Sequence, residues 1–198
     1  MYLSKAKLYA MITNKAQSLG FNVFAPNYKI DACKLAIENC VNLDIQILPF
    51  EDLKICGILF KGEFSTVIGL NARRSAVGKN FDCMHELIHY WFHKQSSFYC
   101  NEDDKNHLEW QANSGAAQFL MPYQSFIPNY CNLHDKLYAR YSQTPEAAFE
   151  KIISILAKNY MVGEIAARIR IQSLAPEIAQ YIKGTPIKSI KIIPAARL

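Results

Sequence analysis

Residues 85 to 89 read His-Glu-Leu-Ile-His, a spacing that can perform chemistry if the segment is helical. Side chains four positions apart lie one turn apart on the same face of a helix, so His85 and His89 can present two imidazoles to one metal ion. Glu86 lies about 100° around the helix from His85, beside that face. From there its carboxylate can take a proton from a water on the metal. The motif therefore predicts metal-assisted hydrolysis with Glu86 as the general base.

The helix expected around this motif runs from about Ala76 to His93. Its apolar residues share one stripe and its polar residues share the other side, as is typical of an active-site helix. The stripe holds Met84, Leu87, Ile88 and Trp91, and the other side holds Asp82, His85, Glu86 and His89. The alternative is a chance match on a surface helix, and this division of the residues favours the metal site.

A third ligand is expected because catalytic zinc usually has three protein ligands and one water. On the next predicted helix, 106–121, Glu109 can point at the metal, and Asn113 lies one turn further on the same face. Asn113 can hydrogen-bond a ligand imidazole from outside, as metal-bound histidines usually require. Taken alone, Glu109 would be interpreted as a solvated carboxylate; together with the upstream motif it becomes the expected third ligand.

Other polar side chains near the motif are weaker candidates. His93 continues the i, i+4 series, but it lies another turn away, about 5–6 Å, so we expect it beside the ligands or at the surface. His107 is a fallback ligand, and Cys100 could reach a metal from the polar loop expected at 94–105. The candidates for stabilising an oxyanion lie further along the chain: Tyr123, Tyr130 and His134.

The periodicity around these motifs predicts helices, then a small antiparallel sheet, then helices again, which is an α+β arrangement. Helices are expected at 4–19, 28–40, 76–93, 106–121, 145–160, 164–174 and 176–182, and strands at 41–47, 54–61 and 64–71. The short Lys61-Gly62-Glu63 link joins the last two strands as a hairpin. We expect a metal-binding domain over 1–135 and a C-terminal helical extension over 136–198 that packs on it.

The composition fits an ordinary globular protein. Of the 198 residues, 51% are hydrophobic and 20% are charged, and the net charge is +5. Disorder is therefore not expected, and the dispersed lysines argue against direct nucleic-acid binding. The six cysteines form no Cys-x-x-Cys pair, which indicates reduced thiols. No apolar run could span a bilayer and the first residues do not resemble a signal peptide, so we expect a cytoplasmic protein without a membrane partner.

Two blocks taken together resemble the ImmA/IrrE family of metallopeptidases. HELIHYWFH carries the His-Glu-x-x-His helix, and EWQANSGAAQFLMP carries the Glu-x-x-Ala-Asn and Leu-Met-Pro segments of that family. The similarity covers roughly Val41 to Pro122, and the later stretch LAKNYMVGEIAARIRIQSL resembles the helical pair that often follows. Gly115 stands where the family has a bulky aromatic residue, so local packing is expected to differ there.

The resemblance implies a minimal zincin-like fold of the gluzincin type, with a small sheet above the active-site helix. It also implies Zn²⁺ as cofactor, with His85, His89 and Glu109 as ligands and Glu86 as general base. Family members often belong to mobile elements or stress-response loci, where they cleave or otherwise inactivate a helix-turn-helix repressor. A zinc metalloendopeptidase acting on such a regulatory protein is thus implied. We expect its peptide substrate to pair with the strand Ser65–Leu70 at a sheet edge.

Two other functions stay open at this point. Ala157 to Arg170 has a weak helix-turn-helix pattern with Arg168 and Arg170 on its second helix, which would suit a DNA-binding regulator with a non-catalytic metal site. Met161 holds the turn position where glycine is expected, so two packed helices are the simpler interpretation. The other possibility is a partner-binding protein with a structural zinc, but such sites normally have four protein ligands and three are evident. The oligomeric state stays open.

Overall fold

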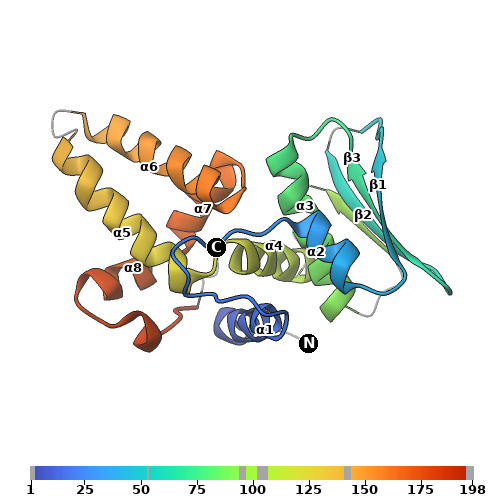
Figure 1. Cartoon of the computed structure of the whole chain (residues 1–198), viewed down its shortest axis with the longest axis horizontal. Coiled ribbons are helices and arrows are strands. Elements are labelled where there is room, and N and C mark those ends of the chain that lie inside the picture. Colours follow the sequence, from blue (N-terminus) through green and yellow to red (C-terminus); the bar gives the residue numbers. More distant parts are fainter. Residues whose placement is uncertain (1–2, 53, 94–96, 102–106, 141–143, 195–198) are drawn as a thin grey trace. The chain divides into compact units, whose positions relative to one another are not determined.

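The structure is a computed structural model that describes residues 3–52, 54–93, 97–101, 107–140 and 144–194, with the backbone alone for 97–101. This part of the chain contains eight α-helices, a short 3-10 helix at Ile187–Ser189 and four strands (Figure 1). The helices are α1 (Lys5–Ser18), α2 (Ala32–Asn39), α3 (Ala76–Phe92), α4 (His107–Leu120), α5 (Tyr123–Arg140), α6 (Pro145–Tyr160), α7 (Glu164–Ser173) and α8 (Ala175–Ile182). The strands are β1 (Leu43–Leu48), β2 (Ile55–Lys61), β3 (Thr66–Asn71) and β4 (Ser97–Asn101).

These elements pack as two compact units. The first comprises Ile30–Ala116 and contains α2, the four strands, α3 and the beginning of α4. The second comprises Leu3–Lys29 and Ala117–Leu198 and contains α1, the end of α4 and the helices α5 to α8. The domain limit expected at residue 135 falls within α5, and the expected division into a domain and an extension stays a prediction.

The sheet of the first unit has the strand order β1-β3-β2-β4. β2 and β3 form the expected hairpin and run antiparallel, with Gly57 opposite Leu70, and β4 is antiparallel to β2. β1 runs parallel to β3, with Leu43 opposite Thr66, so the sheet is mixed and not purely antiparallel. The predicted α+β class is confirmed. The edge position expected for Ser65–Leu70 is wrong, because β3 lies between β1 and β2.

α3 packs on β2, β3 and α2, and several polar contacts fix it there. Its N-terminus is capped by Ser75, whose Oγ accepts a hydrogen bond from the backbone N–H of Gly78 at 3.1 Å. Arg74 donates two hydrogen bonds to the Asp82 carboxylate, at 2.9 and 3.2 Å. The Asn80 side chain bonds the backbone at both sides of the α2 N-terminus, which ties α2 to α3. The helix that carries the motif is therefore held at its N-terminal half.

Both sides of α3 are buried. The predicted apolar stripe is confirmed in Met84, Leu87 and Ile88, which have no exposed surface and belong to the core with Leu59 and Ile68 of the sheet. The polar side is enclosed as well, since every residue from Asp82 to His89 is buried. Burial of so many polar groups on one helix requires partners for them, which the functional site supplies.

The second unit contains a helix that periodicity did not predict. α5 follows directly after Pro122, which ends α4 as expected, and it includes Pro128. An interior proline removes a backbone N–H donor and normally disfavours a helix. Here the first turns of α5 are buried at Gln124, Ser125, Phe126 and Ile127, so tertiary packing outweighs the local preference.

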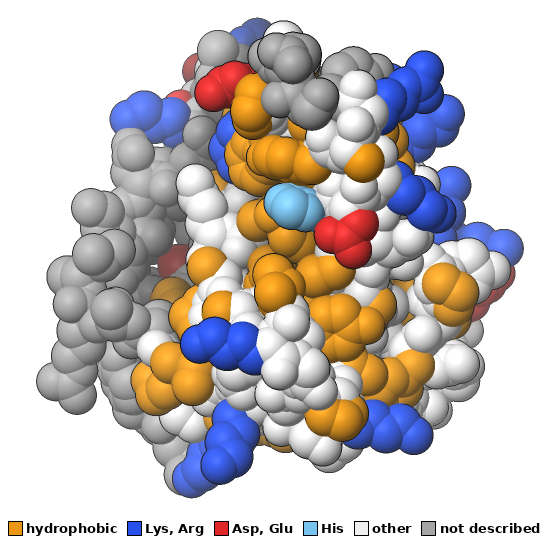
Figure 2. All heavy atoms as spheres, turned by 90° about the vertical axis from the view of Figure 1, so that its left-hand side faces the viewer, with side chains coloured by type: hydrophobic (Ala, Val, Ile, Leu, Met, Phe, Trp, Pro, Cys, Tyr) orange, Lys and Arg blue, Asp and Glu red, His pale blue; other side chains and the backbone are white. Residues whose placement is uncertain are grey.

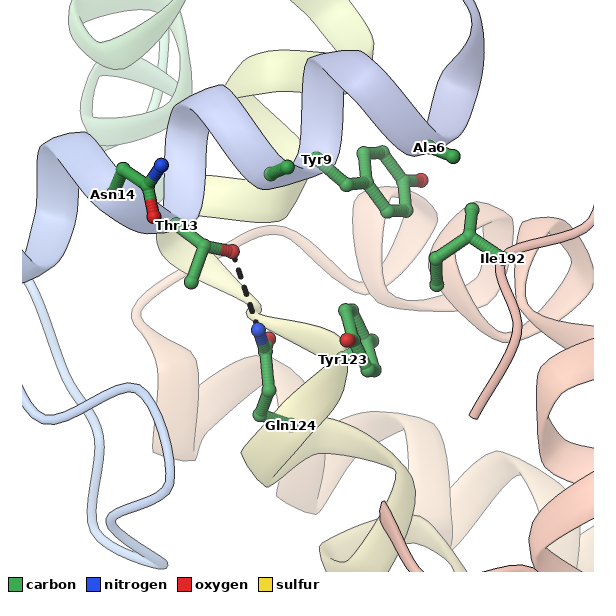
Figure 3. A pocket seen from close by; sticks show the side chains of 8 residues that line it. Ala6, Tyr9, Thr13, Asn14, Tyr123, Gln124 and Ile192 are labelled. Atoms are coloured by element: carbon green, nitrogen blue, oxygen red, sulfur yellow. Dashed lines mark hydrogen bonds between the residues drawn. The ribbon is translucent and has the colours of Figure 1, made fainter. Parts of the chain in front are cut away.

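A cavity of about 240 Å³ lies in this unit between α1, the start of α5 and the C-terminal segment (Figure 3). Tyr9 and Thr13 of α1, Tyr123 and Gln124 of α5, and Ile192 line it. Gln124 Nε2 donates a hydrogen bond to Thr13 Oγ1 at 3.2 Å, the contact drawn as a dashed line in Figure 3. This contact joins the first helix of the chain to α5 within the unit.

The remaining predicted elements agree with the structure to within a few residues, with two exceptions. The segment 94–105 was expected to be a loop, yet its residues Ser97–Asn101 form the strand β4. The helix expected over 28–40 begins at Ala32, where Asp31 caps it by accepting a hydrogen bond from Lys34 N–H at 3.0 Å. No helix in the described part of the chain has the length and apolar character needed to cross a membrane.

Candidate metal centre

The centre is formed by α3 and α4, both of which contribute side chains from the first unit. His85 and His89 lie one turn apart on α3, and their Nε2 atoms are 3.0 Å from each other. Glu109 lies in the first turn of α4, with Oε2 3.0 Å from His85 Nε2 and Oε1 3.2 Å from His89 Nε2. All three residues are buried, and among the described residues they are the group whose ligand atoms converge as a metal requires. We call them the His85–His89–Glu109 cluster.

The spacing of this cluster fits a zinc ion. Zinc holds histidine nitrogen at 2.0–2.1 Å and carboxylate oxygen at 2.0–2.2 Å in a tetrahedron, whose ligand atoms are then about 3.3 Å apart. The two Nε2 atoms are 3.0 Å apart, and each is 3.0 or 3.2 Å from the nearer Glu109 oxygen, within a few tenths of an ångström of that value. The donor set of two imidazoles and one carboxylate is also one that catalytic zinc uses.

Asn113 contacts the cluster from outside. It lies one turn beyond Glu109 on α4, and its Oδ1 is 3.0 Å from His85 Nδ1. An amide oxygen can only accept a hydrogen bond, so His85 donates from Nδ1 and keeps the lone pair of Nε2 directed at Glu109 and His89. The lone pairs of the cluster therefore converge, and a cation is what stabilises such an arrangement.

The pKa values of the three residues agree with a site that attracts a cation. Burial would raise the pKa of Glu109, but the imidazole nitrogens of His85 and His89, 3.0 and 3.2 Å away, hold it at about 2, so the carboxylate is ionised at neutral pH. Burial lowers the pKa of His89. Burial also acts to lower the pKa of His85, but the carboxylates of Glu109, 3.0 Å away, and Glu86 favour a proton on this imidazole and raise that pKa. A metal ion replaces the proton that His85 otherwise attracts.

Glu86 lies beside the cluster and is completely buried. The sheet meets it at Gly57 of β2, where a Cβ atom would lie 2.7 Å from Glu86 Oε1 and 3.3 Å from Glu86 Cγ. A side chain at this point would force the carboxylate to shift. Sequence reasoning did not identify Gly57 as part of the site, although a glycine inside a strand pattern is a signal of close approach.

His93 lies on the other side of His89. Its Nδ1 is 2.8 Å from His89 Nδ1, and its ring centroid is 4.8 Å from that of His89. Its place beside the ligands, and outside the cluster, is one of the two positions expected for it. His107, the fallback ligand, contacts Gln111 and not the cluster. The side chain of Cys100 lies outside the described ones.

The three candidates for stabilising an oxyanion all lie on α5, in the second unit. His134 stacks on Tyr138 with ring centroids 4.2 Å apart, and Tyr130 lies 6.0 Å from His134. Tyr123 lines the cavity of Figure 3. Burial raises the pKa of Tyr123 and of Tyr130, so each keeps its hydroxyl proton at neutral pH. The role of these three residues stays a prediction.

The weak helix-turn-helix pattern corresponds to α6 and α7, joined at Met161 and Gly163. Arg170 is buried and donates to the Met121 carbonyl at 3.0 Å and to Tyr9 Oη at 2.6 Å. Arg168 is paired with Glu150 at 2.6 Å. Both arginines are thus engaged within the protein. On the face shown in Figure 2, basic side chains are scattered around apolar ones and form no continuous track of the kind that nucleic acids need.

Comparison with known proteins agrees with the geometry of the site. The family model described as the IrrE N-terminal-like domain, Peptidase_M78, matches residues 38–172, which include both α3 and α4. No curated protein matches the chain. The matched region covers well over half of the sequence and contains every residue of the His85–His89–Glu109 cluster together with Glu86. The chain therefore belongs to the ImmA/IrrE family of metallopeptidases.

Proposed function

We propose that this metallopeptidase is a zinc-dependent endopeptidase that hydrolyses a peptide bond in a regulatory protein. The observation that carries the proposal is the convergence of three buried ligand residues, whose nearest nitrogen and oxygen atoms are 3.0–3.2 Å apart, beside a second buried carboxylate that is not one of them. In this assignment His85, His89 and Glu109 hold the ion and Glu86 is the general base. A closed structural site would need a fourth protein ligand, and none is found among the described residues.

Each residue has a defined task in the hydrolysis. Bound zinc supplies a Lewis acid that polarises the scissile carbonyl and makes water more acidic. Glu86 accepts the proton of the attacking water and passes it to the nitrogen of the leaving amine, so that both products leave neutral at the reacting atoms. Glu86 is completely buried, so its carboxylate is shielded from bulk water. Gly57 keeps the strand β2 close enough to hold that carboxylate in one place.

The substrate class rests on the resemblance to the family. ImmA/IrrE proteins act on helix-turn-helix repressors, and we infer a repressor of this kind as the substrate here. Cleavage in a segment that links the DNA-binding part to the rest of such a repressor would remove its control of transcription. This inference places the protein in the regulation of a mobile element or a stress response, in the cytoplasm.

The proposal is tested with purified protein, zinc and a panel of helix-turn-helix repressors, with products identified by mass spectrometry. We expect one new pair of fragments from one repressor, abolished by a chelator, restored by zinc and absent with Glu86→Gln. Elemental analysis should find about one zinc per chain in the wild type and much less in Glu109→Ala.

Two results would count against the proposal. A folded wild type that takes up no zinc, even after the metal is added back, would remove the metal site. Cleavage that continues in Glu86→Gln at the wild-type rate would show that Glu86 is not the base.

A further inference from the structure

His93 occupies a position that the hydrolysis proposed above does not use. It is the C-terminal cap of α3, with extended backbone angles (φ −114°, ψ 134°), and its side chain is buried. The 2.8 Å contact between its Nδ1 and His89 Nδ1 falls on the nitrogen of His89 that faces away from Glu109. His93 is therefore placed to act on the metal centre through His89, as Asn113 acts through His85.

The contact continues from His93 to α4. His93 Nε2 is 3.4 Å from Gln111 Oε1, and the amide nitrogen of Gln111 is within hydrogen-bond distance of His107 Nε2. The His107 ring stacks on Trp110, with centroids 6.0 Å apart and an angle of 13° between the planes. A chain of polar contacts thus leads from a ligand on α3 to the first turn of α4, the turn that contains Glu109.

The amide of Gln111 fixes the direction of this chain. Its oxygen can only accept, so His93 must donate from Nε2, and a neutral His93 then accepts at Nδ1. His89 in turn must donate from Nδ1, which leaves the lone pair of its Nε2 directed at Glu109. At the other end, the amide nitrogen of Gln111 donates to His107. Every donor in the chain meets an acceptor, and the proton of His89 is kept off the nitrogen that faces the cluster.

The backbone of His93 is held independently of its side chain. Its N–H donates to the His89 carbonyl at 3.0 Å, which completes the last turn of α3. Its own carbonyl accepts a hydrogen bond from Lys61 Nζ at 2.7 Å, and Lys61 also reaches the Tyr90 carbonyl at 3.2 Å. A lysine at the carbonyl end of a helix is electrostatically favourable. The imidazole of His93 therefore extends from a fixed point.

We propose that His93 is a positioning residue of the metal centre, which accepts the Nδ1–H of His89 and so holds the Nε2 lone pair of His89 towards the metal. The proposal rests on the zinc site of the proposed function, and it assigns to His93 an effect on metal binding that does not depend on the substrate. Outer partners of metal-bound histidines commonly change metal affinity by about 10- to 100-fold.

The test compares His93→Leu with His93→Asn. The two replacements have the same branched shape, but the Asn side chain places an acceptor near the former Nδ1 and the Leu side chain does not. Zinc dissociation constants are measured by competition with a chromophoric chelator, and the visible absorption of the Co²⁺-substituted proteins reports ligand geometry. We expect about 10- to 100-fold weaker zinc binding and a changed Co²⁺ spectrum for His93→Leu, with both close to wild type for His93→Asn.

The other outcomes overturn the proposal in distinguishable ways. If His93→Leu binds zinc as tightly as the wild type, His93 does not position His89. If both variants are weakened equally, the ring matters for packing and not as an acceptor, and their melting temperatures should then fall together. If the wild type itself binds neither zinc nor Co²⁺, the proposed function fails first and the role of His93 fails with it.

Discussion

In the first unit, four atoms with lone pairs face one another at 3.0–3.2 Å: the two imidazole Nε2 atoms of His85 and His89, and both carboxylate oxygens of Glu109. In the second unit, the buried Arg170 guanidinium meets only acceptors: the Met121 carbonyl, the Tyr9 hydroxyl and the Gln118 side-chain oxygen. Nearby, Lys5 donates to Glu177 Oε1 at 3.0 Å and to the Ser173 carbonyl at 2.7 Å. Both units bury charged groups, but the cluster around Arg170 pairs donors with acceptors, whereas the His85–His89–Glu109 cluster gathers acceptors.

This difference separates a structural polar cluster from a functional one. Buried polar groups usually have hydrogen-bond partners, and the cluster around Arg170 satisfies that rule with protein atoms alone. Acceptors gathered at one point violate it unless a cation is present. A buried arginine and a buried histidine pair are equally conspicuous in a list of enclosed polar residues, and it is the direction of their hydrogen bonds that distinguishes them.

The largest expected effect comes from comparing two completely buried carboxylates, Glu86 and Glu177. Glu86→Gln should lower the cleavage rate by about 100- to 10,000-fold, because the general base is lost, with zinc content and melting temperature retained. Glu177→Gln should leave cleavage intact but lower the free energy of unfolding by about 3 kcal/mol, because its ion pair with Lys5 is broken. Rate measurements and denaturant unfolding check both. Similar losses of cleavage rate in the two variants would contradict the assignment of Glu86 as the base and of Glu177 as a structural residue.

Arg170→Met should have the next largest effect, and only on stability. The change leaves three buried acceptors, those of Met121, Tyr9 and Gln118, without their donor. We expect the free energy of unfolding to fall by about 3 kcal/mol. The zinc dissociation constant of the folded protein should be unchanged. A weakened zinc site in this variant would mean that the two polar clusters are coupled.

Removal of zinc should lower the free energy of unfolding by somewhat less than Arg170→Met does. With free zinc at 100 times its dissociation constant, binding contributes about 2.7 kcal/mol to stability. We expect a chelator to lower the melting temperature by the same amount in the wild type and in Arg170→Met, and to have little effect on Glu109→Ala. Differential scanning calorimetry checks this. An equal shift in Glu109→Ala would show that the chelator acts elsewhere.

The smallest effect is expected from two glycines of the sheet. A Cβ at Gly57 would meet Glu86 Oε1 at 2.7 Å, whereas a Cβ at Gly69 would meet the Ile58 side chain at the same distance. Gly57→Ala should therefore lower kcat by about 10-fold through displacement of the base, with KM and zinc content little changed. Gly69→Ala is the matched control, with a similar loss of stability and a kcat close to wild type. Equal kcat values for the two variants would contradict a positioning role for Gly57.

The elements and residues that could be predicted from the sequence are those marked by a pattern within a short stretch of the chain. Helical spacing identified His85, Glu86 and His89, and the same reasoning on the next helix identified Glu109 and Asn113. The strands β1, β2 and β3 and the β2–β3 hairpin followed from alternation and a short polar link. These features depend on residues within one or two turns of each other, where periodicity is informative.

The features that were missed depend on residues far apart in the chain. Alternation marks a strand but does not name its neighbour, so the parallel pairing of β1 with β3 was not foreseen. α5 was missed because Pro128 has a local effect that tertiary packing overrides. Gly57 of β2 and Gln111 of α4 matter because each of them contacts a residue of α3 or of its C-terminal cap. The spacing of residues within β2 or within α4 does not predict such a contact.

The strand β2 touches α3 at two points that lie four residues apart. Gly57 meets the base Glu86, and Lys61 caps the turn that ends at His93. Four strand residues span about 13 Å and the seven residues from Glu86 to His93 span about 10.5 Å of helix, so the two lengths correspond. Since side chains alternate along a strand, a slip of β2 by one residue would turn both contacts away from the helix together. The register of one strand thus sets the alignment of base and ligands at once.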